Sequence, residues 1–399
     1  MRLLLPLLAA SMLLVGCEEE LTVPGQCPEL CPGGQPVVRD TIVLAIEESD
    51  SSFFGYTGRG SVTSLLVSNG LAAGEARAWV EFPVRPDSIQ MSDSTRVYTT
   101  DSVRITFSMT GRDTTVDDLK VYLHRVPRTL DSSSTFADID QHLVAGTLID
   151  SIIVPDSVRS GSISRLITDS ANLANLIPAA DSGRRALGLR LVAEAPTGVR
   201  LSAILGSGGA SFITYGRVAV ADTSRRRQTI SLSAADNGFA LQGQEAPSDP
   251  DLLYVGRVPS ARTILRFPIP EFFDDPSVVL VRATLELTPS LPIVGLKGDA
   301  AVVDVRGVSK DIGAKSSPVL TISGSATLPV DSSELFGIDV LNLVRFWRLS
   351  EDPLPPVFLL AMVPDGGSFH RPVFRSTRSA DGKPRLRITY LRPTPVEQP

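Results

Sequence analysis

The sequence predicts an all-β protein made of two tandem, jelly-roll-like antiparallel β-sandwiches, each with one short helix. One stretch occurs twice, as A-R-A-W-V-E-F-P-V from Ala76 to Val84 and as A-R-T-I-L-R-F-P-I from Ala261 to Ile269. Both copies alternate apolar and polar residues before Phe-Pro, which is typical of a strand in a half-buried sheet. The copies begin 185 residues apart, close to one domain length, and this spacing indicates two related domains.

Composition supports this fold class. The 399 residues are enough for two sandwiches with separate cores. With 43% hydrophobic and 21% charged residues, the chain has the balance of a folded protein. High Val, Ser, Thr, Gly and Pro usage, with few long stretches of helical period, predicts mostly β structure. The net charge of −6 and the lack of a basic stripe argue against nucleic acid as a partner.

The first residues have the layout of a secretory signal. Met1-Arg2 is positively charged, and Leu3 to Val15 is an apolar run too short to span a bilayer. The run ends L-V-G-C at Cys17, which resembles the lipobox of bacterial lipoproteins, where the cysteine is acylated and becomes the mature N-terminus. The resemblance implies a signal peptide over 1–16 and a lipid anchor on Cys17. The alternatives are an ordinary signal peptide with an incidental cysteine, or a cytosolic protein.

The resemblance also bears on location. In such lipoproteins an Asp after the cysteine retains the protein at the inner membrane. Here Glu18 follows, so we expect the outer membrane, with the chain facing the periplasm or the cell surface.

Residues 17–38 are expected to form a flexible tether, because this stretch is rich in Pro and Gly and shows no periodicity. Cys27 and Cys31 lie within it. In an oxidising compartment the pair predicts a small disulfide loop, and free or intermolecular thiols are the alternative. A redox site would need C-x-x-C on a folded scaffold, and a zinc site would need two further ligands.

We expect the first sandwich to span 39–233. A helical stripe from Ile163 to Ile177 interrupts its strands. The expected strands are 40–46, 62–67, 76–84, 103–109, 119–126, 148–154, 187–193, 211–218 and 228–232.

The second sandwich is expected over 235–393, in the same order, with Phe239 to Leu241 as a candidate first strand and a helix within Leu335 to Leu349. In this scheme 371–376 corresponds to the 211–218 strand, and 386–391 closes the domain as 228–232 does. The expected strands are 252–255, 261–269, 278–287, 300–308, 356–363, 371–376 and 386–391.

The second copy resembles a known family. Its stretches A-R-T-I-L-R-F-P-I, V-R-A-T-L-E-L, D-V-L-N-L-V-R-F-W and L-R-I-T-Y-L are similar to those of DNRLRE-type β-sandwich modules of secreted bacterial proteins. These modules look like carbohydrate-binding modules, so the resemblance implies polysaccharide binding. The hexapeptide that names the family is absent, and no ligand-contacting position of the family maps onto this chain.

Motifs for catalysis or cofactors are missing. The sequence has no P-loop, HExxH, GxSxG or EF-hand pattern, so we expect no cofactor, no metal site and no enzymatic activity. His124, His142 and His370 are scattered and have no companion ligands. Paired acids at 117–118 and 274–275 are explained by turns and caps more readily than by calcium.

Trp79 is the candidate ligand platform. Alternation places it on the outer sheet face with Arg77 and Glu81, and an exposed aromatic ring between polar groups suits a sugar ring. The alternative is that a helix or loop covers this face and makes Trp79 a core residue, which Ile264 at the matching position favours. Trp347 is expected to pack its helix onto the sandwich.

Two functions follow. The preferred interpretation is a non-enzymatic, membrane-anchored lipoprotein that binds extracellular or periplasmic polysaccharide. The alternative is a structural or protein-docking envelope lipoprotein without a small ligand.

Overall fold

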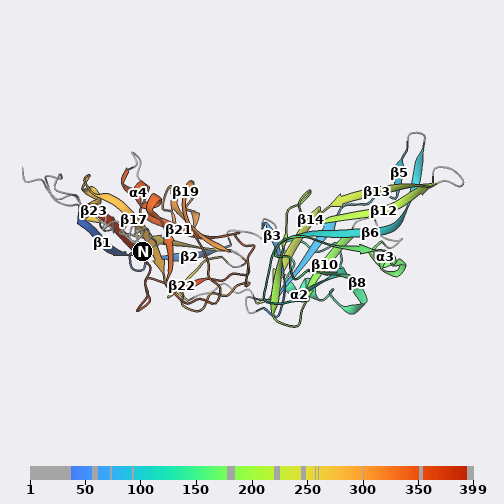
Figure 1. The fold of residues 1–399 in the computed structure, drawn as a ribbon, viewed down its shortest axis with the longest axis horizontal. Helices are drawn as coiled ribbons and strands as arrows, with labels where there is room; N and C mark the ends of the chain where they lie inside the picture. The colour runs from blue at the N-terminus through green and yellow to red at the C-terminus, as the bar shows by residue number, and fades with distance from the viewer. Residues whose placement is uncertain are drawn as a thin grey trace, which may run out of the picture.

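The computed structural model describes residues 37–392, except for 56–61, 72–73, 92–93, 178–184, 220–224, 244–248, 257, 259, 300 and 350–353. The expected all-β fold is confirmed, since antiparallel sheets form both lobes of the molecule (Figure 1). Cys17, Cys27 and Cys31 lie outside the described residues.

The first domain is a two-sheet sandwich. One sheet has the order β14-β4-β10-β7-β8, and the other β13-β12-β6-β11-β3, with β5 and β9 also paired to β6. Side chains such as Phe82, Phe107 and Phe212 fill the space between the sheets. The strands are β3 (Ser64–Asn69), β4 (Ala76–Phe82), β5 (Ser88–Gln90), β6 (Thr95–Arg112), β7 (Lys120–Arg125), β8 (Leu148–Ile153), β9 (Gly161–Ile167), β10 (Arg185–Val192), β11 (Thr197–Ser202), β12 (Ser211–Ala219), β13 (Arg225–Ser233) and β14 (Asp236–Leu241).

The C-terminal domain is a second sandwich. Its sheets have the orders β2-β16-β21-β18-β19 and β1-β23-β17-β20, beside a two-stranded β15-β22 sheet. The strands are β1 (Val37–Leu44), β2 (Ser51–Phe54), β15 (Leu252–Tyr254), β16 (Ala261–Arg266), β17 (Val279–Leu287), β18 (Val302–Val308), β19 (Pro318–Thr327), β20 (Phe336–Asp339), β21 (Val357–Val363), β22 (Val373–Arg375) and β23 (Arg385–Arg392).

The first strands of the chain belong to the last domain. The expectation that 40–46 opens the first sandwich is wrong, because β1 pairs with β23 along its whole length, from Val37 opposite Arg392 to Leu44 opposite Arg385. Conversely, β14 pairs with β4 in the first domain, so Phe239 to Leu241 does not begin the second. The expected boundaries, 39–233 and 235–393, therefore do not match the sheets.

The two domains share one topology. Strand for strand, β14-β4-β10-β7-β8 matches β2-β16-β21-β18-β19, and β13-β12-β6-β9 matches β1-β23-β17-β20. The β3-β11 pair likewise matches β15-β22. In this scheme β23, not 371–376, corresponds to the 211–218 strand. The domains are thus circular permutants, because the strand pair that ends the first domain is supplied to the second by the chain's N-terminal segment.

The β1-β2 pair is tied into the C-terminal domain by its core and by its turn. Val43 and Ala45 join the hydrophobic cluster of that domain. Between the strands, the fully buried carboxylate of Asp50 accepts hydrogen bonds from the backbone N–H and hydroxyl of Thr377, at 2.8 and 2.7 Å, and from Arg378 at 3.1 Å. These bonds compensate the desolvation of a buried charge.

The helices are short. The stripe expected from Ile163 to Ile177 splits into β9 and α3 (Ser170–Leu176), because Asp169 caps the helix by accepting from the N–H groups of residues 171 and 172. Likewise Leu335 to Leu349 holds β20 and α4 (Leu341–Leu349), whose Trp347 packs on Phe267 and Phe358 as expected. The first domain also carries α2 (Phe136–Asp140), which the sequence did not predict.

Candidate functional site

The Trp79 face is covered. Arg77, Trp79 and Glu81 lie on the outer side of β4, as alternation predicts, but they are only 2%, 1% and 8% exposed. The β7-β8 connection, which carries α2, folds over this face. Its apolar side chains, together with Ala186 of β10 and Ala240 of β14, form a separate small core around the indole. The side chains from the connection are Val126, Leu130, Phe136, Ile139 and Leu143. The structure thus agrees with the alternative in which Trp79 is a core residue, and the indole is not an open platform.

Two glycines make room for this packing. Gly188 and Gly238 are the cross-strand neighbours of Trp79 on β10 and β14. A Cβ at Gly238 would lie 3.0 Å from the indole Nε1, and one at Gly188 would lie 2.4 Å from Leu143 Cδ2 and 2.5 Å from Val126 Cγ1. Side chains at these two positions would therefore displace either the indole or its cover.

The substitution Gly188→Ala is expected to lower the free energy of unfolding by about 1–3 kcal/mol, because the added methyl overpacks the contact between sheet and cover. It should also shift Trp79 fluorescence to the red by loosening the cover. Gly146→Ala is the matched control, since a Cβ there meets nothing within 4 Å. Equal stability of the two variants in urea unfolding would show that the cover is not packed on β10 at Gly188.

Arg77 holds the cover in place. Its guanidinium donates to Asp140 at the end of α2, at 2.7 Å, and to Glu75 at 2.6 Å, and it lies 5.1 Å from the ring centre of Phe136. Its remaining donors reach backbone carbonyls, including that of Ser68 at 3.0 Å. A buried guanidinium with this many partners has a structural role, which is to fasten α2 to the sheet.

Glu81 borders an open groove of about 700 Å³ at the end of β4. Its lining is polar and has no aromatic ring: Glu81, Pro83, Val84, Arg128, Thr129, Leu130, Asp131, Ala235 and Asp236. The hydroxyl and backbone N–H of Ser133 donate to Asp131 and lower the pKa of its carboxyl.

The equivalent residue of the C-terminal domain has the opposite charge. Arg266 occupies the position equivalent to Glu81 and pairs with both oxygens of Asp311, at 2.5 and 2.7 Å. The two otherwise equivalent domains therefore differ in charge at this position.

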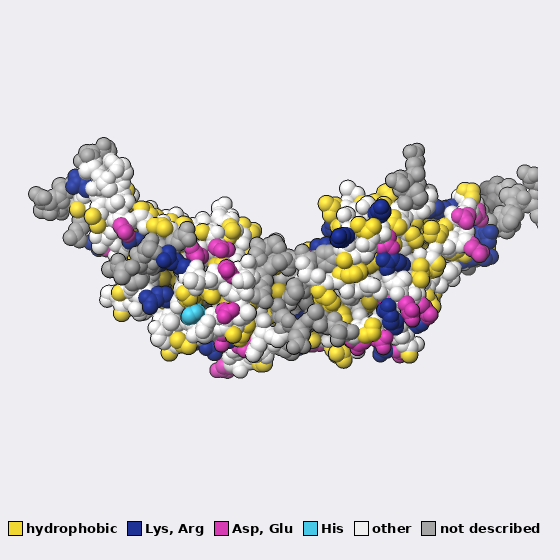
Figure 2. Space-filling view, turned by 180° about the vertical axis from the view of Figure 1, so that it is seen from behind, with side chains coloured by type: hydrophobic (Ala, Val, Ile, Leu, Met, Phe, Trp, Pro, Cys, Tyr) yellow, Lys and Arg dark blue, Asp and Glu magenta, His cyan; other side chains and the backbone are white. Residues whose placement is uncertain are grey.

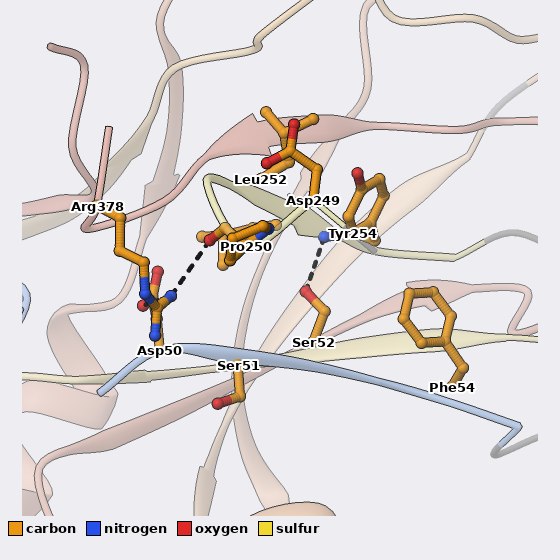
Figure 3. A pocket seen from close by; sticks show the side chains of 10 residues that line it. Asp50, Ser51, Ser52, Phe54, Asp249, Pro250, Leu252, Tyr254 and Arg378 are labelled. Atoms are coloured by element: carbon orange, nitrogen blue, oxygen red, sulfur yellow. Dashed lines mark hydrogen bonds and ion pairs between the residues drawn. The ribbon is translucent and has the colours of Figure 1, made fainter. Parts of the chain in front are cut away.

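A second groove, of about 290 Å³, lies beside β2 in the C-terminal domain (Figure 3). It contains the aromatic pair Phe54 and Tyr254, whose ring centres are 5.9 Å apart. The Tyr254 N–H donates to the Ser52 hydroxyl at 2.9 Å. The lining residues are Asp50, Ser51, Ser52, Phe54, Asp249, Pro250, Leu252, Leu253, Tyr254 and Arg378.

A buried ion pair joins the two domains. Arg200 on β11 donates to Asp299 of the C-terminal domain, and their side chains are only 8% and 2% exposed. Burial raises the pKa of the Asp299 carboxyl, although the bond to Arg200 opposes this. Leu296 and Phe369 of the C-terminal domain meet Gly198 beside the pair and join the hydrophobic cluster of the first domain. The domains therefore share part of one core.

His370 lies in the same junction and is fully buried. Burial, together with the nearby Arg200 charge, lowers its pKa to about 4. The unfolded chain takes up a proton on this imidazole near pH 6.5, whereas the folded chain resists it down to about pH 4. The contribution of neutral His370 to the stability of the folded chain is therefore complete above pH 6.5 and is lost as the pH falls towards 4.

We expect protonation of His370 to lower the free energy of unfolding by up to about 3 kcal/mol between pH 6.5 and pH 4. This value is the difference between the two pKa values of His370 multiplied by 1.36 kcal/mol per pKa unit. Urea unfolding of the wild type and of His370→Leu at pH 7 and pH 4.5 measures this, because the pH dependence should be flatter in the variant. His142→Gln provides the control. If the wild type and His370→Leu have the same pH dependence, His370 is not buried as an imidazole in solution.

Comparison with models of known protein families, with curated proteins and with solved structures found no match. The resemblances to a lipobox and to DNRLRE-type modules therefore stay predictions from the sequence. In the part of the chain that the structure describes, no three His, Cys, Asp or Glu side chains are grouped closely enough to hold a metal ion. No helix in that part has the length and hydrophobicity needed to cross a bilayer.

Sequence reasoning missed the Phe54–Tyr254 groove and the junction. The segment that holds Phe54 reads as a Gly/Ser-rich loop, and its partner Tyr254 is 200 residues away. The segment S-S-F-F is short and does not alternate, so it gives no strand signal, and only its pairing with β16 shows that it is a strand.

Proposed function

We propose that this chain is an exported, lipid-anchored and non-enzymatic lipoprotein. Its interlocked sandwiches hold the first domain away from the membrane as a spacer and docking element for another envelope protein. One observation carries the proposal: β1, which continues directly from the tether, is built into the C-terminal domain by eight residue pairs with β23. The anchor is therefore connected directly to the C-terminal domain, and the first domain lies on the far side of the C-terminal domain from β1 (Figure 1).

The junction supports a spacer. Two sandwiches on a flexible linker would not hold a fixed distance, whereas the shared core and the Arg200–Asp299 pair make the two domains one packed unit. The Trp79 face, which would have been the sugar platform, is covered within the first domain and offers no open ring.

The experiment is fractionation of cells that produce the wild type or Cys17→Ala. We expect the wild type in the outer-membrane fraction and the variant released from membranes, because a cysteine is needed to carry the acyl chains. Unchanged fractionation would remove the anchor. With the anchored protein as bait, crosslinking in intact envelopes is expected to capture a protein partner, and capture of none would argue against docking.

Polysaccharide binding is the second candidate, and the Phe54–Tyr254 groove favours it. The half-buried ring of Phe54, packed near Tyr254 and beside the exposed carboxylate of Asp249, is a combination suited to a sugar ring. Retardation of the protein in gels that contain polysaccharides tests it. Binding that Phe54→Ala abolishes and Trp79→Phe leaves intact would favour this function, and absence of retardation across a broad panel would exclude it.

A further inference from the structure

The tether enters the fold beside an exposed aliphatic patch. Val38 on β1 is 56% exposed, and Val279 and Val281 on β17 are 56% and 47% exposed. Leu391 on β23 lies between the two strands and pairs with Val38 on one side and Val279 on the other, so these three side chains lie on one face of the sheet. We call Val38, Val279, Val281 and Leu391 the aliphatic patch. Aliphatic side chains exposed together at one end of a sheet are unusual for a surface that contacts only water.

The equivalent surface of the first domain is different. There β13 takes the place of β1 and begins with Arg225, Arg226 and Arg227, of which the last two are exposed. Charged side chains are a common protection for an edge strand. The aliphatic patch is therefore a property of the domain that continues from the tether and not of the shared fold.

The patch also has basic neighbours. Arg39 and Arg282 are exposed beside it, and the side chain of Arg392 is 50% exposed and 3.4 Å from Asp275. Figure 1 places β1, β17 and β23 at the end of the C-terminal lobe that points away from the first domain. Figure 2 shows Lys and Arg side chains near that end, at the right of its view, with Asp and Glu side chains among them. Apolar side chains rimmed by arginines suit the interface of a bilayer with anionic headgroups.

The tether limits what can reach the patch. The sequence predicts a flexible tether that includes residues 17–36, and a flexible chain of that length spans on average about 25 Å. We therefore expect the membrane that holds the anchor to lie within reach of the patch. We propose that the aliphatic patch docks on this lipid surface and stands the long axis of the molecule away from the membrane; this inference rests on the anchor in the proposed function.

The test imposes the anchoring by chemistry, so that it does not depend on acylation in cells. The chain from residue 17 to 399, with an N-terminal histidine tag and with Cys17, Cys27 and Cys31 changed to Ser, is held on vesicles by a nickel-chelating lipid. A polarity-sensitive fluorophore is attached to Val38→Cys or to Val279→Cys. The matched control is Val97→Cys in the first domain, where the side chain is 75% exposed.

We expect a blue shift of the fluorophore at 38 and 279, and quenching by brominated lipid several-fold stronger than at 97, on vesicles of phosphatidylethanolamine and phosphatidylglycerol. Emission at 38 equal to that at 97 would overturn the proposal. A blue shift without lipid, together with a dimer in size-exclusion chromatography, would also overturn it and identify a second copy as the occupant. Release of Cys17→Ala in cells tests the anchor separately.

Discussion

A chain that begins at Gly55, and so lacks β1 and β2, is expected to lose the fold of its C-terminal domain while the first domain stays folded. Removal of β1 uncovers the edge of β23, and removal of β2 uncovers the edge of β16. The core also loses Val43 and Ala45. We expect the combined loss to exceed the stability of an ordinary domain, which is about 5–15 kcal/mol. The first domain supplies its own β13 and β14 and is complete without the deleted segment.

Moving the same segment to the other end of the chain is expected to restore the domain. Val37 lies opposite Arg392, so a short linker from Arg392 to Val37 makes a β-hairpin of β23 and β1. The first domain already has this connection, because residues 220–224 join β12 to β13. The permuted chain would run from Gly55 to Arg392, continue through five linker residues and end with 37–54.

The two tryptophans report on the domains separately. Trp347 is buried in the C-terminal domain and Trp79 in the first. In the truncated chain we expect solvent-exposed emission from Trp347, observed in a Trp79→Phe background, and unchanged emission from Trp79, observed in a Trp347→Phe background. A native Trp347 signal after truncation would show that β1 and β2 are dispensable. Failure of the permuted chain to recover it would show that the segment does not pair with β23 in solution.

Most individual strands could be predicted from the sequence, but their partners could not. The apolar run in D-T-I-V-L-A-I identifies a strand, and the structure has a strand there. The run does not identify the buried face, because Val43 is buried whereas Ile42 and Leu44 are exposed. Nothing in seven residues specifies which sheet edge they join. The two candidate edges are those of β12 and β23. The edge of β12 is already occupied by β13, which follows β12 directly in the chain. Assigning β1 to the nearest domain in sequence was therefore the wrong inference.

The candidate site shows the same limit. The periodicity placed Arg77, Trp79 and Glu81 on one face correctly, because that depends only on their own strand. Whether the face is open depends on α2, whose five residues are too short for a helical period, and on Gly188 and Gly238 in other strands. Exposure is thus a property of remote segments, and the residues on the strand itself do not encode it.

At the junction, Asp299→Ala is expected to destabilise the protein by about 3–5 kcal/mol. The substitution leaves the guanidinium of Arg200 buried without its carboxylate, and arginine cannot lose its proton to relieve the cost. Arg200→Met should cost less, because the remaining carboxyl of Asp299, whose pKa burial already raises, can take up a proton and become neutral. The gap between the two variants should widen as the pH falls from 7 to 5.

The double variant Arg200→Met with Asp299→Leu tests whether the Arg200–Asp299 ion pair is buried in solution. With both charges removed and the volume filled, we expect it to be more stable than Asp299→Ala alone, since no unpaired charge is buried. Arg217 and Asp101, an exposed pair 2.6 Å apart, give the control, and Asp101→Ala there should cost no more than about 1 kcal/mol. Urea unfolding at pH 7 measures all four variants. If Asp299→Ala costs no more than Asp101→Ala, then water reaches Arg200, and the two domains do not pack through a closed junction.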